Sequence, residues 1–85
     1  MWNRPIHVLT RAELYDLVWG EPVETVARRY KLSGNGLAKI CNKHRIPLPP
    51  RGYWAKVQHG QKPRRVSLRP AKTPDDETVR ITEGT

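Results

Sequence analysis

Cysteine and long apolar runs are what this sequence most lacks. Its single cysteine, Cys41, cannot form an internal disulfide or supply a cysteine-rich zinc site. No run approaches the roughly 18 apolar residues that a membrane-spanning helix requires, and residues 1–10 lack the apolar core of a signal peptide. We therefore expect a soluble, cytoplasmic protein with no membrane partner, no cofactor and no metal site.

Phenylalanine is absent, and only 36% of the residues are hydrophobic. Three tryptophans and three tyrosines carry much of the apolar mass. A chain of 85 residues buries a modest share of its surface on folding, which leaves it marginally stable. We expect one small domain with tails.

Acidic residues are missing from the middle of the chain. Residues 25–74 contain thirteen lysines and arginines and no aspartate or glutamate, and the net charge is +8. A solvated helix face usually alternates in sign, so this long stretch of one sign favours a polyanion as partner. The acidic residues flank this stretch and form no cluster for a catalytic metal, and no nucleophile pairs with the three histidines. An enzyme is not expected, and no small-molecule ligand is evident.

Apolar residues from Val23 to Ile40 fit two short helices joined by a tight turn. The face of the first helix consists of Val23, Val26, Ala27 and Tyr30, spaced three and four residues apart. Leu37 and Ile40 form the face of the second. Because only Lys31–Gly34 lies between them, the two helices must cross steeply and bury these faces against each other.

This spacing resembles the helix-turn-helix unit of bacterial and phage DNA-binding proteins. Ala27 matches the small residue of the first helix, and Leu32 the apolar residue of the turn. Lys31 stands where the family often has glycine. An ordinary helical hairpin has the same periodicity. The resemblance implies double-stranded DNA as the partner, with a homodimer, formed in solution or only on DNA, suited to a palindromic site.

Three helices are expected, at residues 11–19, at about 22–30 and at 34–44. Thr10 and Glu13 have the spacing of a capping box, and Ser33 is the expected N-cap of the third helix. Leu37, Ile40 and Cys41 are expected to point inward. The predicted fold class is all-α: a small three-helix helix-turn-helix domain over residues 9–57, preceded by an arm (residues 1–8) and followed by a flexible basic, then acidic, tail (residues 58–85).

The opposite face of the third helix is the candidate DNA-reading surface. The candidates for contacts to base edges are Ser33, Asn35, Ala38, Lys39 and Asn42. Asparagine pairs with adenine, lysine reaches guanine, and alanine touches a thymine methyl group. The candidates for phosphate or flanking contacts are Arg28, Arg29, Lys31, Lys43, Arg45, Arg51, Lys56, Arg64 and Arg65. A polar, solvated helix face is the alternative.

The segment after the third helix, IPLPPRGYWAK, is similar to one in uncharacterised bacterial helix-turn-helix proteins. Its prolines predict an extended strip, and Arg51-Gly52 weakly resembles the core of an AT-hook. Tyr53 and Trp54 either pack on the helices, which we favour, or contact nucleic acid. Beyond it, we expect a basic tail that becomes ordered on binding, a brief strand at Val66–Leu68, and disorder over residues 70–85.

The leading hypothesis is a sequence-specific DNA-binding protein associated with the nucleoid, most simply a transcriptional regulator. Alternatives are an architectural or recombination accessory protein of a mobile element, an RNA-binding protein, and an interaction module that docks an acidic protein. The first eight residues are either an arm for the minor groove or, as we favour, a frayed terminus.

Overall fold

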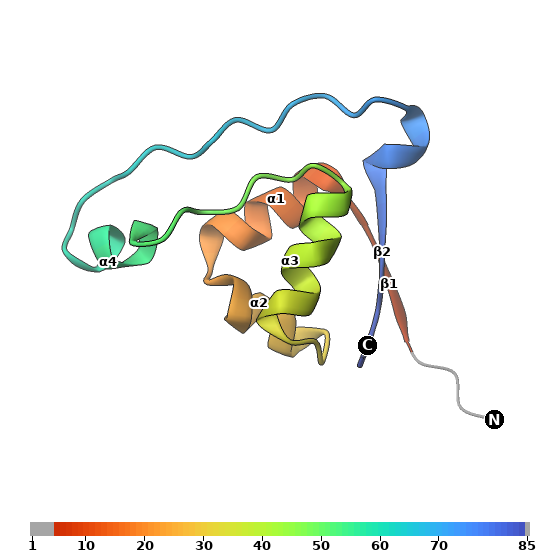
Figure 1. Cartoon of the computed structure of the whole chain (residues 1–85), viewed down its shortest axis with the longest axis horizontal. Helices are drawn as coiled ribbons and strands as arrows, with labels where there is room; N and C mark the ends of the chain where they lie inside the picture. Colours follow the sequence, from red (N-terminus) through yellow and green to blue (C-terminus); the bar gives the residue numbers. More distant parts are fainter. Residues whose placement is uncertain (1–4, 85) are drawn as a thin grey trace.

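The computed structural model describes residues 5–84, except the side chain of Asp76. Its elements are β1 Ile6–Thr10, α1 Arg11–Gly20, α2 Val23–Arg29, α3 Gly34–Lys43, α4 Tyr53–Gln58, the 3₁₀ helix η1 Pro74–Glu77 and β2 Thr78–Thr82. Helices α1, α2 and α3 form the centre, with the strands on one side and α4 at the opposite end (Figure 1).

The prediction of an all-α, three-helix fold is wrong, because residues 5–84 form four α-helices and an antiparallel sheet. Strand β1 pairs with β2 from Ile6 opposite Thr82 to Thr10 opposite Thr78. β1 overlaps the segment expected to be an arm, and β2 lies where disorder was expected. Val79 and Ile81 are completely buried, so β2 supplies apolar cover that three short helices do not provide.

Helix α1 follows β1 directly at Thr10, which caps it. The Glu13 amide donates to Thr10 Oγ1 at 3.0 Å, and the Thr10 amide donates to Glu13 Oε1 at 3.1 Å. The predicted capping box is therefore confirmed. The helix runs one residue beyond the predicted end and includes Gly20.

Helices α2 and α3 end in the same way. After α2, the Leu32 amide donates to the Ala27 carbonyl at 2.9 Å. After α3, the Ile46 amide donates to the Cys41 carbonyl at 2.8 Å. These bonds define Schellman motifs, whose left-handed residue is usually glycine. Here the left-handed positions hold Lys31 (φ 56°) and Arg45 (φ 55°).

The core lies between the helices and the inner face of the sheet. Its buried apolar members are Leu14, Val18, Trp19, Val26, Ala27, Leu32, Leu37, Cys41, Ile46, Tyr53, Val79 and Ile81.

Tyr53 packs edge-on against Trp19, with ring centroids 5.0 Å apart, and the Trp19 indole N–H donates to the Pro47 carbonyl at 2.8 Å. Tyr53 therefore packs in the core, as favoured above, whereas Trp54 is only half-buried. Helix α4 follows the prolines of the segment that we expected to be extended.

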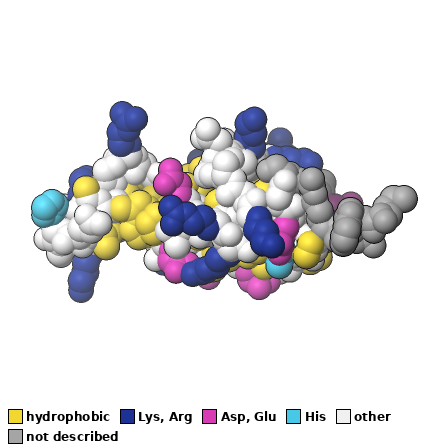
Figure 2. Space-filling model, turned by 90° about the horizontal axis from the view of Figure 1, so that it is seen from below, with side chains coloured by type: hydrophobic (Ala, Val, Ile, Leu, Met, Phe, Trp, Pro, Cys, Tyr) yellow, Lys and Arg dark blue, Asp and Glu magenta, His cyan; other side chains and the backbone are white. Residues whose placement is uncertain are grey.

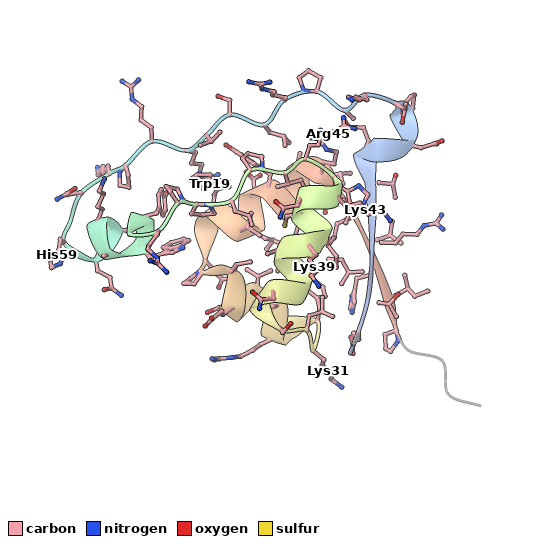
Figure 3. The ribbon with its side chains drawn as sticks, in the orientation of Figure 1. Trp19, Lys31, Lys39, Lys43, Arg45 and His59 are labelled. Carbon is pink, nitrogen blue, oxygen red and sulfur yellow. The ribbon has the colours of Figure 1, made fainter. Side chains whose placement is uncertain are left out.

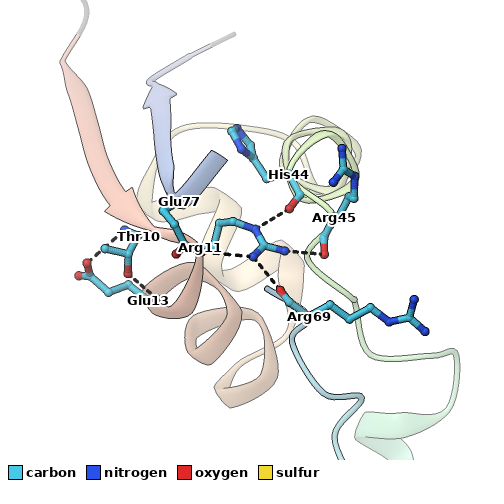
Figure 4. Close-up of polar contacts among 7 residues, drawn as sticks. All are labelled: Thr10, Arg11, Glu13, His44, Arg45, Arg69 and Glu77. Atoms are coloured by element: carbon cyan, nitrogen blue, oxygen red, sulfur yellow. Dashed lines mark hydrogen bonds and ion pairs between the residues drawn. The ribbon is translucent and has the colours of Figure 1, made fainter. Parts of the chain in front are cut away.

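Arg11 is a buried charged residue that joins three distant segments (Figure 4). Its guanidinium donates to the carbonyls of His44 at 2.7 Å, Arg45 at 3.1 Å and Arg69 at 2.8 Å. Glu77 lies 3.8 Å from the same group. The carbonyls at the end of a helix lack partners within that helix. Arg11 therefore caps α3 and fixes the position of the chain beyond α4.

Residues 59–73, the return segment, run from α4 back to η1 along the edge of the helices (Figure 1). The Tyr15 hydroxyl donates to the Val66 carbonyl at 2.6 Å, and Arg65 pairs with Asp16 at 3.2 Å. No strand forms at Val66–Leu68, contrary to the prediction. A strand needs a neighbouring strand with which to form hydrogen bonds. The return segment does not pair with β1 or β2, so the apolar–polar–apolar pattern of Val66–Leu68 does not produce a strand.

Candidate nucleic-acid interface

Helix α3 is held by its inner face and exposes its outer face. Leu37 and Cys41 are completely buried, and Ile40 is half-buried against the core, as predicted. Burial raises the pKa of the Cys41 thiol to about 11, so this residue stays neutral and acts as a small apolar side chain. The orientation of α3 is therefore fixed by packing, independently of any partner.

The outer face of α3 carries the side chains predicted to read bases. Asn35, Lys39 and Asn42 are exposed, and Ala38 is half-buried between them. Lys39 and Lys43 lie along the helix between Lys31 at the turn and Arg45 at its C-terminal end (Figure 3). Within residues 5–84, neither Lys39 nor Lys43 has an acidic partner. This leaves two cations and two amides available on one helical face.

Ser33 differs from the other candidates because its hydroxyl has a structural role. Its Oγ accepts from the Gly36 amide at 3.0 Å, which confirms Ser33 as the N-cap of α3. Its next neighbour, Gly34, lies close to α2, since a β-carbon at this position would approach Glu24 Cγ to 3.0 Å. The crossing of α2 and α3 therefore accounts for a glycine at position 34.

Several of the predicted phosphate contacts already have partners within the chain. Arg29 pairs with Glu21, and Lys31 lies 3.8 Å from Glu83. Arg65 pairs with Asp16 and lies over the Tyr15 ring, 5.9 Å from its centroid. The remaining basic candidates with exposed side chains are Arg28, Lys43, Arg51, Lys56 and Arg64. Arg45 is exposed too, but it also has interaction partners within the chain.

The fold divides these basic residues into groups. Arg28, Lys31, Lys39, Lys43 and Arg45 lie on α2, the turn, α3 and its end. The return segment approaches the same end of α3, because a groove of about 290 Å³ is lined by Asn42, Arg45 and the return segment's Val66, Ser67 and Arg69.

Arg51 and Lys56 belong to a different part of the surface, next to α4. Arg51 lines an open groove of about 400 Å³ with Val23, Leu48 and Trp54. Figure 2 shows hydrophobic side chains gathered toward the α4 end of the molecule. The structure thus separates these two cations from the outer face of α3.

An acidic side chain, Glu83, also lies close to the turn, although it is far from Lys31 in the sequence. Glu83 contacts Lys31, and its other carboxylate oxygen is 2.7 Å from Nε2 of His7. Figure 2 shows acidic side chains between basic ones in the middle of this face. Residues 25–74 contain no acidic residue, but the fold brings acidic side chains from other parts of the chain next to them.

Arg80 is an exposed basic residue that the sequence argument overlooked. It lies on the outer face of β2, opposite Val8 of β1. The alternation of Thr78, Val79, Arg80, Ile81 and Thr82 is a strand signal that would have identified it.

Comparison with protein-family models, with curated proteins and with solved structures found no match. Among residues 5–84, no helix is long and apolar enough to cross a membrane. Within residues 5–84, no three or more histidine, cysteine, aspartate or glutamate side chains come together in a group that could hold a metal ion.

Proposed function

We propose that the protein binds double-stranded DNA in a sequence-specific manner and acts as a transcriptional regulator, which would place it on the nucleoid in the cytoplasm. The observation that carries this proposal is the outer face of α3, where Asn35, Lys39, Asn42 and Lys43 are exposed on a helix whose inner face is fixed. Such a face suits the major groove, where amide and ammonium groups distinguish base pairs.

The ends of α2 and α3 support the same proposal. A left-handed backbone costs a residue with a β-carbon roughly 1–2 kcal/mol relative to the usual conformation. Both positions hold a basic residue, Lys31 or Arg45, where glycine would avoid this cost. Backbone strain at a surface position suggests a function. Positive charge on either side of α3 would hold the two phosphate backbones that border the groove.

Selection from a random duplex pool tests the proposal and yields the bound motif. We expect one enriched motif, and a complex whose log affinity falls linearly with log salt concentration. Lys39→Ala or Asn35→Ala should relax the preference at one position, at a cost of about 1–3 kcal/mol for a lost bidentate contact. Lys62→Gln is the matched control, since Lys62 is exposed on the return segment and belongs to neither α3 nor its flanking turns.

Equal affinity for every duplex, or an affinity independent of salt, would contradict the proposal. The same complexes distinguish the other nucleic-acid functions. Strong bending of the bound duplex favours an architectural protein, and stronger competition by RNA of equal length favours an RNA-binding protein. The symmetry of the selected motif reports whether one copy or two bind.

A further inference from the structure

Strand β1 has an open edge that is defined by the ladder it forms with β2. The Glu83 amide donates to the Pro5 carbonyl at 3.1 Å, and Ile6 lies opposite Thr82. In an antiparallel pair the main-chain groups of successive residues point alternately toward and away from the neighbouring strand. The groups of His7 and Leu9 therefore point to β2, and those of Ile6 and Val8 point to the open edge.

The side chains of Ile6 and Val8 at this edge are exposed to solvent. Ile6 and Val8 are each 61% exposed, on the sheet face opposite to the buried Val79 and Ile81. β1, with the sequence IHVLT, contains no lysine, no acidic residue and no proline. Natural edge strands normally carry one of these features to prevent pairing with another strand. β2 lies between β1 and α3 in Figure 4, so the open edge faces away from α3.

We infer that two copies of this chain associate through β1. An antiparallel pairing of β1 with its own copy, about a two-fold axis at His7, places Ile6 opposite Val8 of the second copy and Val8 opposite Ile6. These are the residues whose main-chain groups point outward, so each such pair exchanges two hydrogen bonds. The result is a four-stranded sheet with a four-residue apolar cluster on its outer face.

Self-association through β1 is supported by symmetry and by the absence of formal charge from this strand. An edge strand that pairs with itself needs no second surface, because a two-fold interface uses the same residues on both copies. The chain has a net charge of +8, so two copies repel each other over most of their surface. β1 has no formally charged side chain, which makes it a place where they can approach.

This interface is small, so the dimer should form at high protein concentration and more readily when two copies bind neighbouring sites on one duplex. It does not depend on the DNA-binding proposal, since the edge exists in the free chain. If both hold, the two α3 helices are related by a two-fold axis, which matches an inverted-repeat site.

Sedimentation equilibrium of the free, full-length chain over a wide concentration range, with a reductant present, tests the inference. We expect a reversible monomer–dimer equilibrium. Val8→Glu should weaken dimerisation by about tenfold or more, because the new carboxylate faces Ile6 of the second copy. The fold should tolerate this change, because the carboxylate also faces Arg80 within the chain; circular dichroism and thermal melting verify that it does.

The double variant Ile6→Lys/Val8→Glu tests the register. It restores the wild-type net charge and places a lysine opposite a glutamate of the second copy at both pairs, so dimerisation should recover. Val66→Glu is the matched control, since Val66 is 52% exposed on the return segment and should have no effect. A chain that remains monomeric at every concentration, or a dimer that Val8→Glu leaves intact, overturns the inference.

Discussion

Lys31 and Arg45 each occupy a backbone conformation that opposes stability. Each is a basic residue in a left-handed conformation after a helix, where glycine is the common choice. Lys31 marks the turn position where the resemblance to helix-turn-helix units leads one to expect glycine. The positive φ observed at Lys31 is the physical reason for that preference.

Replacing Lys31 with glycine should raise stability and lower DNA affinity. Glycine removes the left-handed strain at the cost of a more flexible unfolded chain, so we expect a gain of about 1 kcal/mol in the free energy of unfolding. Chemical denaturation measures this gain. DNA binding should weaken, and the slope of log affinity against log salt should fall by about 0.9 if one phosphate contact is lost.

Lys31→Asn provides the control for that experiment, because asparagine tolerates the left-handed region but carries no charge. It should lose DNA affinity as Lys31→Gly does, with a smaller change in stability. Unchanged affinity in both variants would show that Lys31 does not contact DNA. Loss in the glycine variant alone would attribute the effect to turn flexibility.

At the scale of secondary-structure elements, strand β2 contributes to the core, although the sequence predicted disorder at this position. Val79 and Ile81 are completely buried although they belong to a stretch whose polar, acidic composition predicted disorder. Ile81→Ala should therefore destabilise the domain by about 2–5 kcal/mol, as buried large-to-small substitutions do. Urea denaturation followed by tryptophan fluorescence measures this loss.

Val66→Ala is the comparison for that substitution. Val66 is exposed, so its truncation should change stability by no more than about 0.5 kcal/mol. If Ile81→Ala were equally mild, β2 would not be part of the cooperative core. The tail would then behave as the composition of residues 70–85 first suggested.

Helices α1, α2 and α3 were predictable, whereas helix α4 and the sheet were not, for a physical reason. Helices α1 and α3 are marked by local signals, the Thr10–Glu13 capping box and the Ser33 cap, which act within three residues. The β1–β2 ladder joins Ile6 to Thr82, at opposite ends of the chain. The alternation in β2 is a local signal for a strand. It does not reveal which strand β2 pairs with, nor that the sheet is buried against the helices.

The candidate site divides in the same way. The outward placement of Asn35, Lys39 and Asn42 follows from helical periodicity and from burial of Leu37 and Cys41, so the sequence was sufficient. Which cations have acidic neighbours depended on the fold. Arg65 meets Asp16 because the return segment lies along α1, and this contact spans 49 residues.

Charge over the whole molecule is arranged differently from charge along the chain. In the sequence, the acidic residues stand apart from the basic middle. In the fold, the end of the chain returns to the turn between α2 and α3, where the Gly84 amide donates to the Tyr30 carbonyl at 3.3 Å. This return brings Glu83 to 3.8 Å from Lys31. A carboxylate at this position opposes the approach of a phosphate backbone.

Neutralising Glu83 should therefore strengthen DNA binding. Glu83→Gln removes one negative charge beside Lys31, and we expect the affinity to rise about two- to fivefold at low salt, with the gain shrinking as salt screens it. Fluorescence anisotropy over a range of salt concentrations measures the change. Glutamine can still hydrogen-bond His7, so the end of the β1–β2 sheet should stay in place, which the melting temperature verifies.

Asp75→Asn removes the same charge at an exposed residue of η1 and serves as the control. An equal gain in both variants would mean that only net charge matters, whereas no gain for Glu83→Gln would place the turn away from the DNA.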